Sequence, residues 1–349
     1  MIYDLVVAGA GPIGLGTAIE AASAGLSVLV LDPREGQIDK ACGEGLMPPA
    51  RVALDRLGVH PDGLPFRGIR YQAGDAVAEA LFATGPGLGV RRTTLSKALD
   101  QRAAEVGVRR VAGSATAPVV RDGLVTTGGV RGRWLVAADG LHSPTRRSIG
   151  LDPCPDPLPR NGSGAKRGLR YGLRQHYRVQ PWSDLVEVHW AGDAEAYVTP
   201  VARDLVGVAV LCPGGAPYRS WLDRFAVLRT RLATAEPVGQ VRGAGPLRQR
   251  VPGRVAGRSL LVGDAAGYVD ALTGEGISIG LACAQALVGC LVAGRPQDYE
   301  DAWRRITRQY RVSTSALLWA AGRPNLRRAI VPAAQRVPRL FAGIVNRLG

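Results

Sequence analysis

The chain has 349 residues, a formal net charge of +15 and a hydrophobic fraction of 46%. This length allows one large domain interleaved with a smaller one, and no apolar run reaches the roughly 20 residues that a membrane-spanning helix needs. The basic residues are mostly arginines without a nucleic-acid-binding motif and aromatic residues make up only 5%, so we expect no nucleic-acid partner.

The N-terminus and the cysteines indicate the compartment. Residues Met1-Ile2-Tyr3-Asp4 place no basic group before the first apolar run, which is typical of a first strand and not of a signal peptide. The five cysteines have no metal-like spacing and are odd in number. We therefore expect a cytoplasmic protein with reduced thiols and no bound metal.

The first 25 residues show the pattern of a dinucleotide-binding turn. An apolar run at 5–8 leads into a glycine-rich turn, and an alanine-rich helical stretch follows. Gly11 allows the backbone to approach a pyrophosphate, and Gly14 allows the helix to pack closely on the strand. The amides that begin the helix would face the phosphate charge. The residues predicted to bind the cofactor here are Gly9, Gly11, Pro12, Ile13 and Gly14.

A second strand is predicted at 26–31 and ends at Asp32. The acid stands at the distance from the glycine-rich turn that suits a residue bonding the ribose hydroxyls of adenosine. We therefore predict that Asp32, with Pro33 and Arg34 after it, contacts the adenosine half of a dinucleotide.

Residues 61–150 predict a change of domain and a return. The part at 61–90 has short strands between glycine and proline turns, and we assign it to a substrate-binding sheet. Residues 91–150 continue the dinucleotide-binding domain, with a helix at about 94–106 and a strand at 134–138. Asp139 and Gly140 follow that strand and form a second glycine-bearing segment at the expected cofactor site.

Residues 152–250 predict a linker and then the main part of the substrate domain. Proline and glycine are frequent at 152–168, which is typical of a linker or loop. Residues 169–250 alternate in the manner of strands, interrupted by one helix at about 218–233. The predicted substrate-binding domain is therefore 61–90 together with 169–250.

The third glycine-bearing segment distinguishes FAD from NAD. Asp264 follows a strand at 259–262, so its carboxylate can accept hydrogen bonds from the ribitol hydroxyls of FAD. A helix is predicted from Glu275 to about 293, and the partial positive charge of its N-terminus suits the pyrimidine edge of a reduced flavin. The three segments predict FAD bound by a discontinuous domain of 1–60, 91–150 and 251–298. The residues predicted to contact FAD here are Gly263, Asp264, Gly274, Glu275, Gly276 and Ile277.

The C-terminal segment 299–349 is predicted to be a basic helical tail, in which arginines alternate with apolar residues. A helix of this kind can lie on an anionic membrane surface as a peripheral contact. It can also pack over the junction of the two domains with its arginines in water. We favour the second arrangement.

In their order and spacing, these segments resemble the flavoprotein group that contains p-hydroxybenzoate hydroxylase and the geranylgeranyl reductases. The resemblance covers roughly residues 1–300. The turn at 9–14 is similar to the family's dinucleotide motif, Asp139-Gly140 to its middle motif and Gly263-Asp264 to its ribitol-binding motif. Arg92 resembles the family arginine that supports the flavin. The resemblance implies an α/β fold: a Rossmann-like FAD-binding domain with a smaller β-sheet substrate domain.

Two further segments resemble the reductase branch more closely than the hydroxylase branch: Lys40-Ala41-Cys42-Gly43-Glu44-Gly45-Leu46 and 272–277. The resemblance places Cys42 and Gly43 near the flavin ring. Cys42 there either positions substrate and tunes the flavin, as a catalytic residue, or is simply a small residue in a tight loop. The stretch at 195–200 keeps the proline of the reductases' aromatic-rich strand motif but lacks most of its aromatic residues.

Three functions are compatible with these patterns. The hydroxylase-like motifs and the missing aromatic residues favour an FAD-dependent monooxygenase that hydroxylates or epoxidises an apolar or aromatic small molecule through a flavin C4a-hydroperoxide. The segment at 42–45 favours the alternative, a geranylgeranyl-reductase-like enzyme that reduces a carbon–carbon double bond of an isoprenoid or other hydrophobic substrate. The third is a flavin-binding protein without turnover.

The source of electrons is a separate question. No second G-x-G-x-x-G follows a strand, so we expect no separate NADPH domain. The predicted donors are NAD(P)H docking transiently at the flavin, a separate flavin reductase, or the substrate. A basic surface could recruit NADPH or an acidic carrier protein.

Overall fold

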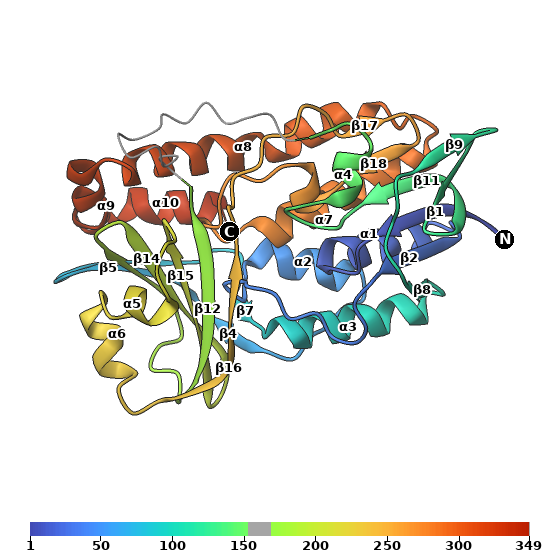
Figure 1. Cartoon of the computed structure of the whole chain (residues 1–349). Helices are drawn as coiled ribbons and strands as arrows, with labels where there is room; N and C mark the ends of the chain where they lie inside the picture. Colours follow the sequence, from blue (N-terminus) through green and yellow to red (C-terminus); the bar gives the residue numbers. More distant parts are fainter. Residues whose placement is uncertain (153–168, 349) are drawn as a thin grey trace.

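The computed structural model describes residues 1–152 and 169–348. From residue 153 on, the predicted linker lies outside the described residues, and Cys154 lies there too. Two large sheets lie at opposite ends of the molecule, and the C-terminal helices extend from one to the other (Figure 1). The expected α/β fold with a Rossmann-like domain and a second sheet is confirmed.

The first sheet is the Rossmann-like one. Its neighbouring strands β18, β11, β1, β2 and β8 all pair in parallel, so their carboxyl ends meet at one edge. Ligands of such sheets bind at that edge. The strands are, in sheet order, β17 (Val255–Ala256), β18 (Ser259–Leu261), β11 (Val130–Ala137), β1 (Ile2–Ala8), β2 (Val28–Asp32) and β8 (Arg109–Ala112), with β10 (Leu124–Thr127) and β9 (Val119–Arg121) attached to β11.

Apolar strands and small helical residues form the core of this half. The core cluster joins β1, β2, β11 and β18 to four helices of this half and to Tyr299 and Trp303 of the C-terminal segment. Gly16 of α1 leaves room for Leu281 of α7. At Gly16 a Cβ atom would stand 2.4 Å from a Leu281 methyl carbon, so a larger residue there would require the Leu281 side chain to move. The helices are α1 (Pro12–Ser23), α2 (Pro48–Arg56), α3 (Arg92–Glu105) and α7 (Gly276–Val292).

The second sheet is almost wholly antiparallel; only β13 and β5 pair in parallel. One face packs on α5 (Tyr218–Leu222) and α6 (Ala226–Arg231), and the other faces the C-terminal helices. The strands are, in sheet order, β16 (Glu236–Ala244), β12 (Tyr171–Arg178), β15 (Leu205–Cys212), β14 (Ala194–Ala202), β13 (Val186–Ala191), β5 (Gly68–Ala73) and β6 (Ala76–Leu81).

A small third sheet connects the two halves. It contains β3 (Gly45–Leu46), β7 (Gly87–Gly89) and β4 (Leu64–Phe66). At Gly89 a Cβ atom would stand 1.8 Å from the Pro200 carbonyl oxygen, so β7 can cross the second sheet closely only with glycine at this position. Of the segment 61–90, only β5 and β6 therefore belong to the substrate sheet as predicted.

The C-terminal segment is three helices, of which the first packs on α7 of the first half and the other two pack on the second sheet. They are α8 (Asp298–Ala321), α9 (Pro324–Arg336) and α10 (Pro338–Leu348). Phe341 and Val345 of α10 pack on Ala78 and Ala80 of β6, and the Asn346 amide bonds the Leu81 carbonyl at 3.0 Å. Helices α9 and α10 thus cover the β5–β6 side of the second sheet. No helix in the described part of the chain combines the length and the apolarity needed to cross a membrane.

The predicted helix at 218–233 is wrong in one respect, because two short helices occupy the segment. Phe225 leaves the helical conformation between them, with φ −102° and ψ 85°. Its side chain is buried beside Trp221 and Leu228 against the sheet. Local periodicity does not reveal such a break, since packing on the sheet determines it. Helix α4 (Pro144–Ser148) completes the helices named here.

Candidate flavin and substrate site

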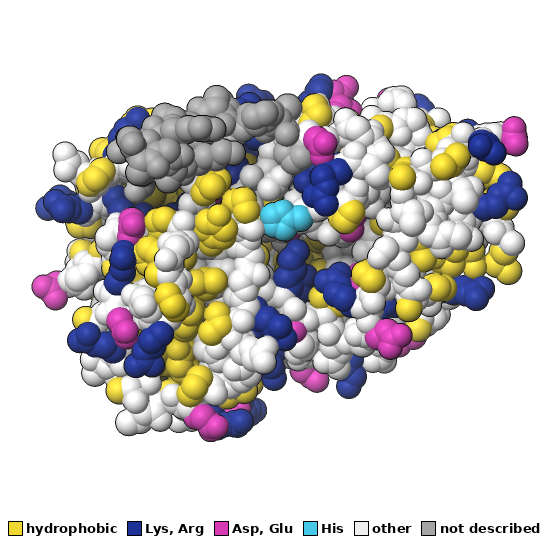
Figure 2. All heavy atoms as spheres, viewed as in Figure 1, with side chains coloured by type: hydrophobic (Ala, Val, Ile, Leu, Met, Phe, Trp, Pro, Cys, Tyr) yellow, Lys and Arg dark blue, Asp and Glu magenta, His cyan; other side chains and the backbone are white. Residues whose placement is uncertain are grey.

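A cavity of about 520 Å³ lies between the carboxyl edge of the first sheet and the tail-facing side of the second. Figure 2 shows a hollow between the two halves of the molecule with lysine and arginine side chains beside it. All three glycine-bearing segments reach this cavity. Of the predicted site residues, those that line it are Gly11, Pro12, Ile13, Arg34, Cys42, Gly43, Arg92, Asp139, Gly140, Gly263, Asp264, Gly274, Gly276 and Ile277.

The glycine-rich turn has the geometry of a phosphate-binding loop. Gly9 has a φ of 106°, and at Gly14 a Cβ atom would stand 1.9 Å from the Gly9 carbonyl oxygen. These two glycines lie behind the cavity and bring the strand, turn and helix together. Gly11 caps α1 without a side-chain hydrogen bond and has open space where a Cβ would be. The helix N-terminus is therefore accessible to an anionic group.

Asp32 is buried, and its carboxylate is hydrogen-bonded to other residues of the protein. Its carboxylate accepts hydrogen bonds from the Ala10 amide at 2.7 Å and from the Arg34 amide and side chain. Burial raises the pKa of Asp32, but these bonds outweigh it and hold the pKa below its usual value. Asp32 and Pro33 are not among the lining residues, whereas Arg34 is. Asp32 thus positions Arg34, which is the side chain that extends to the cavity.

Several polar groups at this end lack partners within the described residues. The Asp139 Oδ2 atom accepts the Thr145 amide at 3.0 Å, but Oδ1 is buried without a hydrogen bond. The Nε atom of Arg92 is also buried and unpartnered there. Buried polar groups are normally satisfied, so these atoms fit a polar ligand. Together with the open helix N-terminus they suit the phosphates and hydroxyls of FAD.

Glu275 lies beside the cavity without lining it. Its side chain is buried, and Oε2 has no hydrogen-bond partner in the described structure. Burial raises the pKa of Glu275 to about 7, because removal from water disfavours the carboxylate. The group is therefore protonated in the folded protein at mildly acidic pH.

The pKa of Glu275 predicts a pH-dependent stability. The pKa falls from about 7 in the folded protein to 4.5 in the unfolded chain, so the folded state holds the proton more tightly. The contribution of Glu275 to the free energy of unfolding should be greatest below pH 4.5 and fall by roughly 3 kcal/mol as the pH rises from there through 7. Urea unfolding of the FAD-loaded protein at pH 5 and pH 8 measures this, and Glu275→Gln should remove most of the difference. Parallel pH dependence in both proteins would contradict the assignment.

A buried network, which the sequence did not indicate, holds the Cys42 loop. Glu44 has a φ of 59°; its Oε1 accepts the Arg92 amide at 2.8 Å and its Oε2 lies 2.6 Å from His176 Nε2. Arg174 donates to His176 Nδ1 at 3.0 Å, so Nε2 carries the hydrogen and donates to Glu44. The network joins the loop, the start of α3 and strand β12. It thereby positions Arg92 and the backbone around Cys42.

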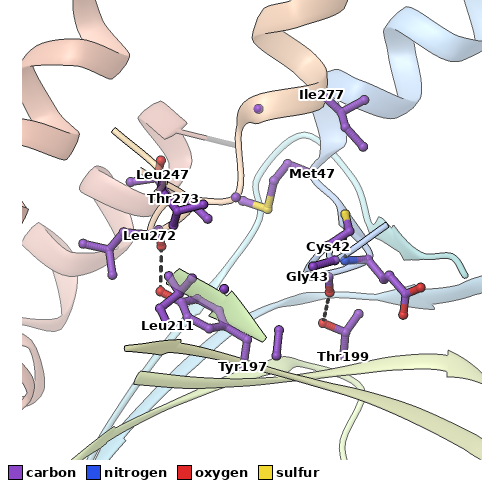
Figure 3. Close-up of a pocket in the computed structure, with 18 of the residues that line it drawn as sticks. Cys42, Gly43, Met47, Tyr197, Thr199, Leu211, Leu247, Leu272, Thr273 and Ile277 are labelled. Carbon is purple, nitrogen blue, oxygen red and sulfur yellow. Dashed lines mark hydrogen bonds between the residues drawn. The ribbon is translucent and has the colours of Figure 1, made fainter. Parts of the chain in front are cut away.

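The second sheet and α10 supply the apolar part of the cavity. Figure 3 shows Cys42 and Gly43 on one side, Leu272 and Thr273 on the other, and Tyr197 and Thr199 rising from the sheet between them. The Tyr197 hydroxyl donates to the Leu272 carbonyl at 3.0 Å, and Thr199 Oγ1 donates to the Gly43 carbonyl at 2.7 Å. These two bonds join the loops on both sides of the pocket to strand β14.

In the part of the cavity between the second sheet and the C-terminal helices, most of the lining side chains are aliphatic or aromatic. The polar side-chain atoms in this part are the hydroxyls of Tyr71, Tyr197, Thr199 and Thr273. Burial raises the pKa of Tyr71 to about 12, so it remains protonated. The side chains of this part are Phe66, Ile69, Tyr71, Val186, Val188, Tyr197, Leu211, Leu247, Leu272, Leu317, Ile330, Ala333, Ala334, Val337, Leu340, Phe341, Ile344 and Val345. The cavity thus has a polar end and a long apolar end.

No family model matches the chain. Among curated proteins, it is 30% identical to a menaquinone reductase of Mycobacterium tuberculosis over 306 residues, 80% of this chain and 74% of the relative. It is 28% identical to digeranylgeranylglycerophospholipid reductase 1 of Methanopyrus kandleri, covering 87% of this chain and 86% of that protein. A para-nitrophenol 4-monooxygenase of a Pseudomonas species is 26% identical, covering 83% and 77%.

Together with the FAD-binding geometry, these relatives decide the family. The chain belongs to the FAD-dependent oxidoreductases of the hydroxylase and geranylgeranyl reductase group. The flavoprotein is therefore an enzyme, as expected. Its fold is also that of the solved p-nitrophenol 4-monooxygenase PnpA from Pseudomonas putida, with a TM-score of 0.78 at 19% identity over 99% of this chain and 98% of that one.

Proposed function

We propose that this flavoprotein reduces a carbon–carbon double bond in a long hydrophobic substrate, of which an isoprenoid chain is the best-fitting class. The observation that carries the proposal is the apolar end of the cavity. It runs from Cys42 past β14 to α9 and α10, and its lining within the described residues offers no carboxylate, amine or imidazole. A hydrocarbon chain would bind there at little cost in desolvation free energy. A polar substrate would lose its hydrogen bonds to water without replacing them.

Reduction of an isolated double bond requires a hydride on one carbon and a proton on the other. Bound FAD, once reduced by two electrons, would supply the hydride and return to the oxidised form. The remaining functions fall to the protein: Arg92, Asp139 and Asp264 hold the cofactor, and the apolar walls orient the chain and exclude water. NAD(P)H as the source of electrons stays a prediction.

Cys42 is the candidate for the proton. Its Sγ atom accepts a hydrogen bond from the Glu44 amide at 3.4 Å, which leaves the thiol hydrogen free to point into the cavity. The Tyr197 hydroxyl is less suitable, because its hydrogen is already donated to the Leu272 carbonyl. The loop geometry thus favours the catalytic alternative for Cys42 over a role in packing alone.

Cys42→Ala is expected to retain FAD and lower the rate of double-bond reduction by roughly 100-fold, within the range for loss of a general acid. Flavin absorbance of the purified protein and single-turnover reoxidation by an alkene substrate measure the two properties. Cys290→Ala, at a half-buried site on α7 away from the cavity, is the matched control. Unchanged turnover in Cys42→Ala would leave Cys42 as a packing residue.

The mass of the product tests the reaction type. The reduced protein is mixed with a geranylgeranyl compound without oxygen, and separately with a phenol in the presence of oxygen. A product with two added hydrogens supports the proposal. Insertion of one oxygen atom would instead establish the monooxygenase, the function that the sequence favours and that the relative named para-nitrophenol 4-monooxygenase also supports.

A further inference from the structure

The last part of the chain has a one-sided charge. From residue 302 to the C-terminus there is no aspartate or glutamate. The same segment carries ten arginines: Arg304, Arg305, Arg308, Arg311, Arg323, Arg327, Arg328, Arg336, Arg339 and Arg347. Among these, Arg336, Arg339 and Arg347 are exposed on or next to α10. This surface therefore attracts anions without an acidic residue of its own segment to oppose them.

The same helix carries apolar side chains that are both exposed and part of the cavity wall. Val337 is 49% exposed, Leu340 61% and Ile344 48%, and all three line the cavity. Three neighbouring lining residues with this exposure indicate that the cavity opens to the surface beside α10. These three side chains, with the exposed Ala333 of α9, form an apolar mouth at the end remote from the glycine-rich turn.

The mouth is held in place by the rest of α10. Phe341 and Val345 are buried against β6, and the Asn346 side chain accepts the Ala83 amide and donates to the Leu81 carbonyl. Leu340, Ile344 and Arg347 follow one another at intervals of four and three residues, so they share one face of the helix. That face presents hydrocarbon and positive charge together, while the anchoring face stays on the sheet.

We propose that α10 and the end of α9 dock on an anionic lipid bilayer and that the apolar mouth receives the hydrophobic substrate directly from the lipid. The substrate part of this inference rests on the proposed function; the docking part does not. Exposed aliphatic side chains would enter the acyl boundary, and Arg336, Arg339 and Arg347 would contact lipid phosphates. The substrate would then move from lipid to cavity without crossing water.

The two ends of the cavity differ in the ligand that they suit. Arg34, Gly43 and Gly274 are exposed at the polar end, which suits FAD and a water-borne electron donor. The opening at α10 is apolar and suits a chain that is insoluble in water. Electrons and substrate would therefore reach the flavin from opposite sides.

Vesicle co-sedimentation of the FAD-loaded protein tests the docking. The probes are vesicles of phosphatidylcholine alone and vesicles of phosphatidylcholine with phosphatidylglycerol. The protein should bind the anionic vesicles and not the neutral ones, and added salt should release it. Replacing Arg336, Arg339 and Arg347 by glutamine should weaken binding by roughly 100-fold, since each basic residue near such a surface contributes about a factor of five.

Matched variants separate this surface from general charge and apolarity. Arg121, Arg203 and Arg229 are exposed elsewhere, and their combined change to glutamine should leave binding largely intact. Leu340→Ser with Ile344→Ser should weaken binding by roughly tenfold or more, whereas Val227→Ser with Val292→Ser should not. Flavin content and urea midpoint verify that each variant is folded. Equal binding by the two arginine variants, or no binding by the wild type, would overturn the proposal.

Failure of docking and failure of the proposed function are distinguishable. A short alkene dispersed in water should be reduced equally by the wild type and by the Arg336/Arg339/Arg347 glutamine variant, because none of these arginines lines the cavity. Only substrate embedded in vesicles should be reduced more slowly by this variant. Equal rates on embedded substrate would overturn delivery through the mouth. Vesicle binding without reduction of any alkene would remove the proposed function and leave the docking surface standing.

Discussion

Asp264→Ala is expected to yield a protein without bound flavin. Asp264 lines the cavity in the turn Gly263–Ala266 directly after β18, and no described residue hydrogen-bonds to its carboxylate. Each hydrogen bond between a charged group and its partner contributes about 1.5–3 kcal/mol, so loss of the carboxylate should weaken FAD binding by roughly 10- to 150-fold for each bond that it makes to the ribitol. Visible absorbance of the purified protein and titration of the apoprotein with FAD give the two readouts.

Two controls accompany this variant. Asp264→Asn retains an acceptor and should bind FAD with intermediate affinity. Asp298→Ala removes an acid that is exposed at the start of α8 and should leave the protein yellow. A fully loaded Asp264→Ala protein would refute the proposed contact between this carboxylate and the ribitol.

Glu195→Ala should cause the largest loss of stability. Glu195 is fully buried on β14 and lies 2.6 Å from both Arg170 and Arg327. Arg327 belongs to α9 and also donates to the Ala194 carbonyl at 2.7 Å. Removing the carboxylate leaves Arg327 buried without a counter-charge within hydrogen-bond distance, which typically costs about 3–5 kcal/mol. We expect a lower urea midpoint and faster proteolytic cleavage within the C-terminal helices.

An exposed ion pair provides the comparison. Asp184 pairs with Arg67 at the surface, where both side chains are more than half exposed, and Asp184→Ala should cost at most about 1 kcal/mol. Glu195→Leu combined with Arg327→Met replaces charge by apolar volume and keeps the pair between Arg170 and Asp270. It should be more stable than Glu195→Ala. A Glu195→Ala protein as stable as Asp184→Ala would show that this cluster does not fix α9 to the sheet.

The parts of the site that the sequence predicted well are those with local requirements. Gly9 and Gly14 are needed because the turn brings a helix within contact of its own strand, and Gly11 because a ligand must approach the backbone. Such steric requirements involve residues close together in the chain, so they appear in the sequence as a recognisable motif. Asp32 shows the limit of this reasoning: the motif locates the acid correctly, but its partners are Ala10 and Arg34.

The network around Glu44 could not be predicted in the same way. Glu44 and His176 are 132 residues apart in the chain and meet only because β12 passes beneath the Cys42 loop. At Gly207 on β15, a Cβ atom would stand 2.9 Å from a Glu44 oxygen, so a third distant segment provides the space. The segment 40–46 that contains Glu44 is recognisable in the sequence, but nothing around His176 or Gly207 indicates that these residues meet it.

The sequence by itself therefore determined the cofactor and the Rossmann-like domain, because backbone approach and helix N-termini impose short, contiguous motifs. It also identified a basic, helical C-terminal segment. Only the tertiary structure decided that Leu340, Ile344 and their neighbours form part of the cavity wall and open it to the surface. That outcome depends on the packing of α10 against β6, which lies some 260 residues earlier in the chain. The amphipathic pattern of a helix indicates that one face is buried, but it does not identify the element that buries it.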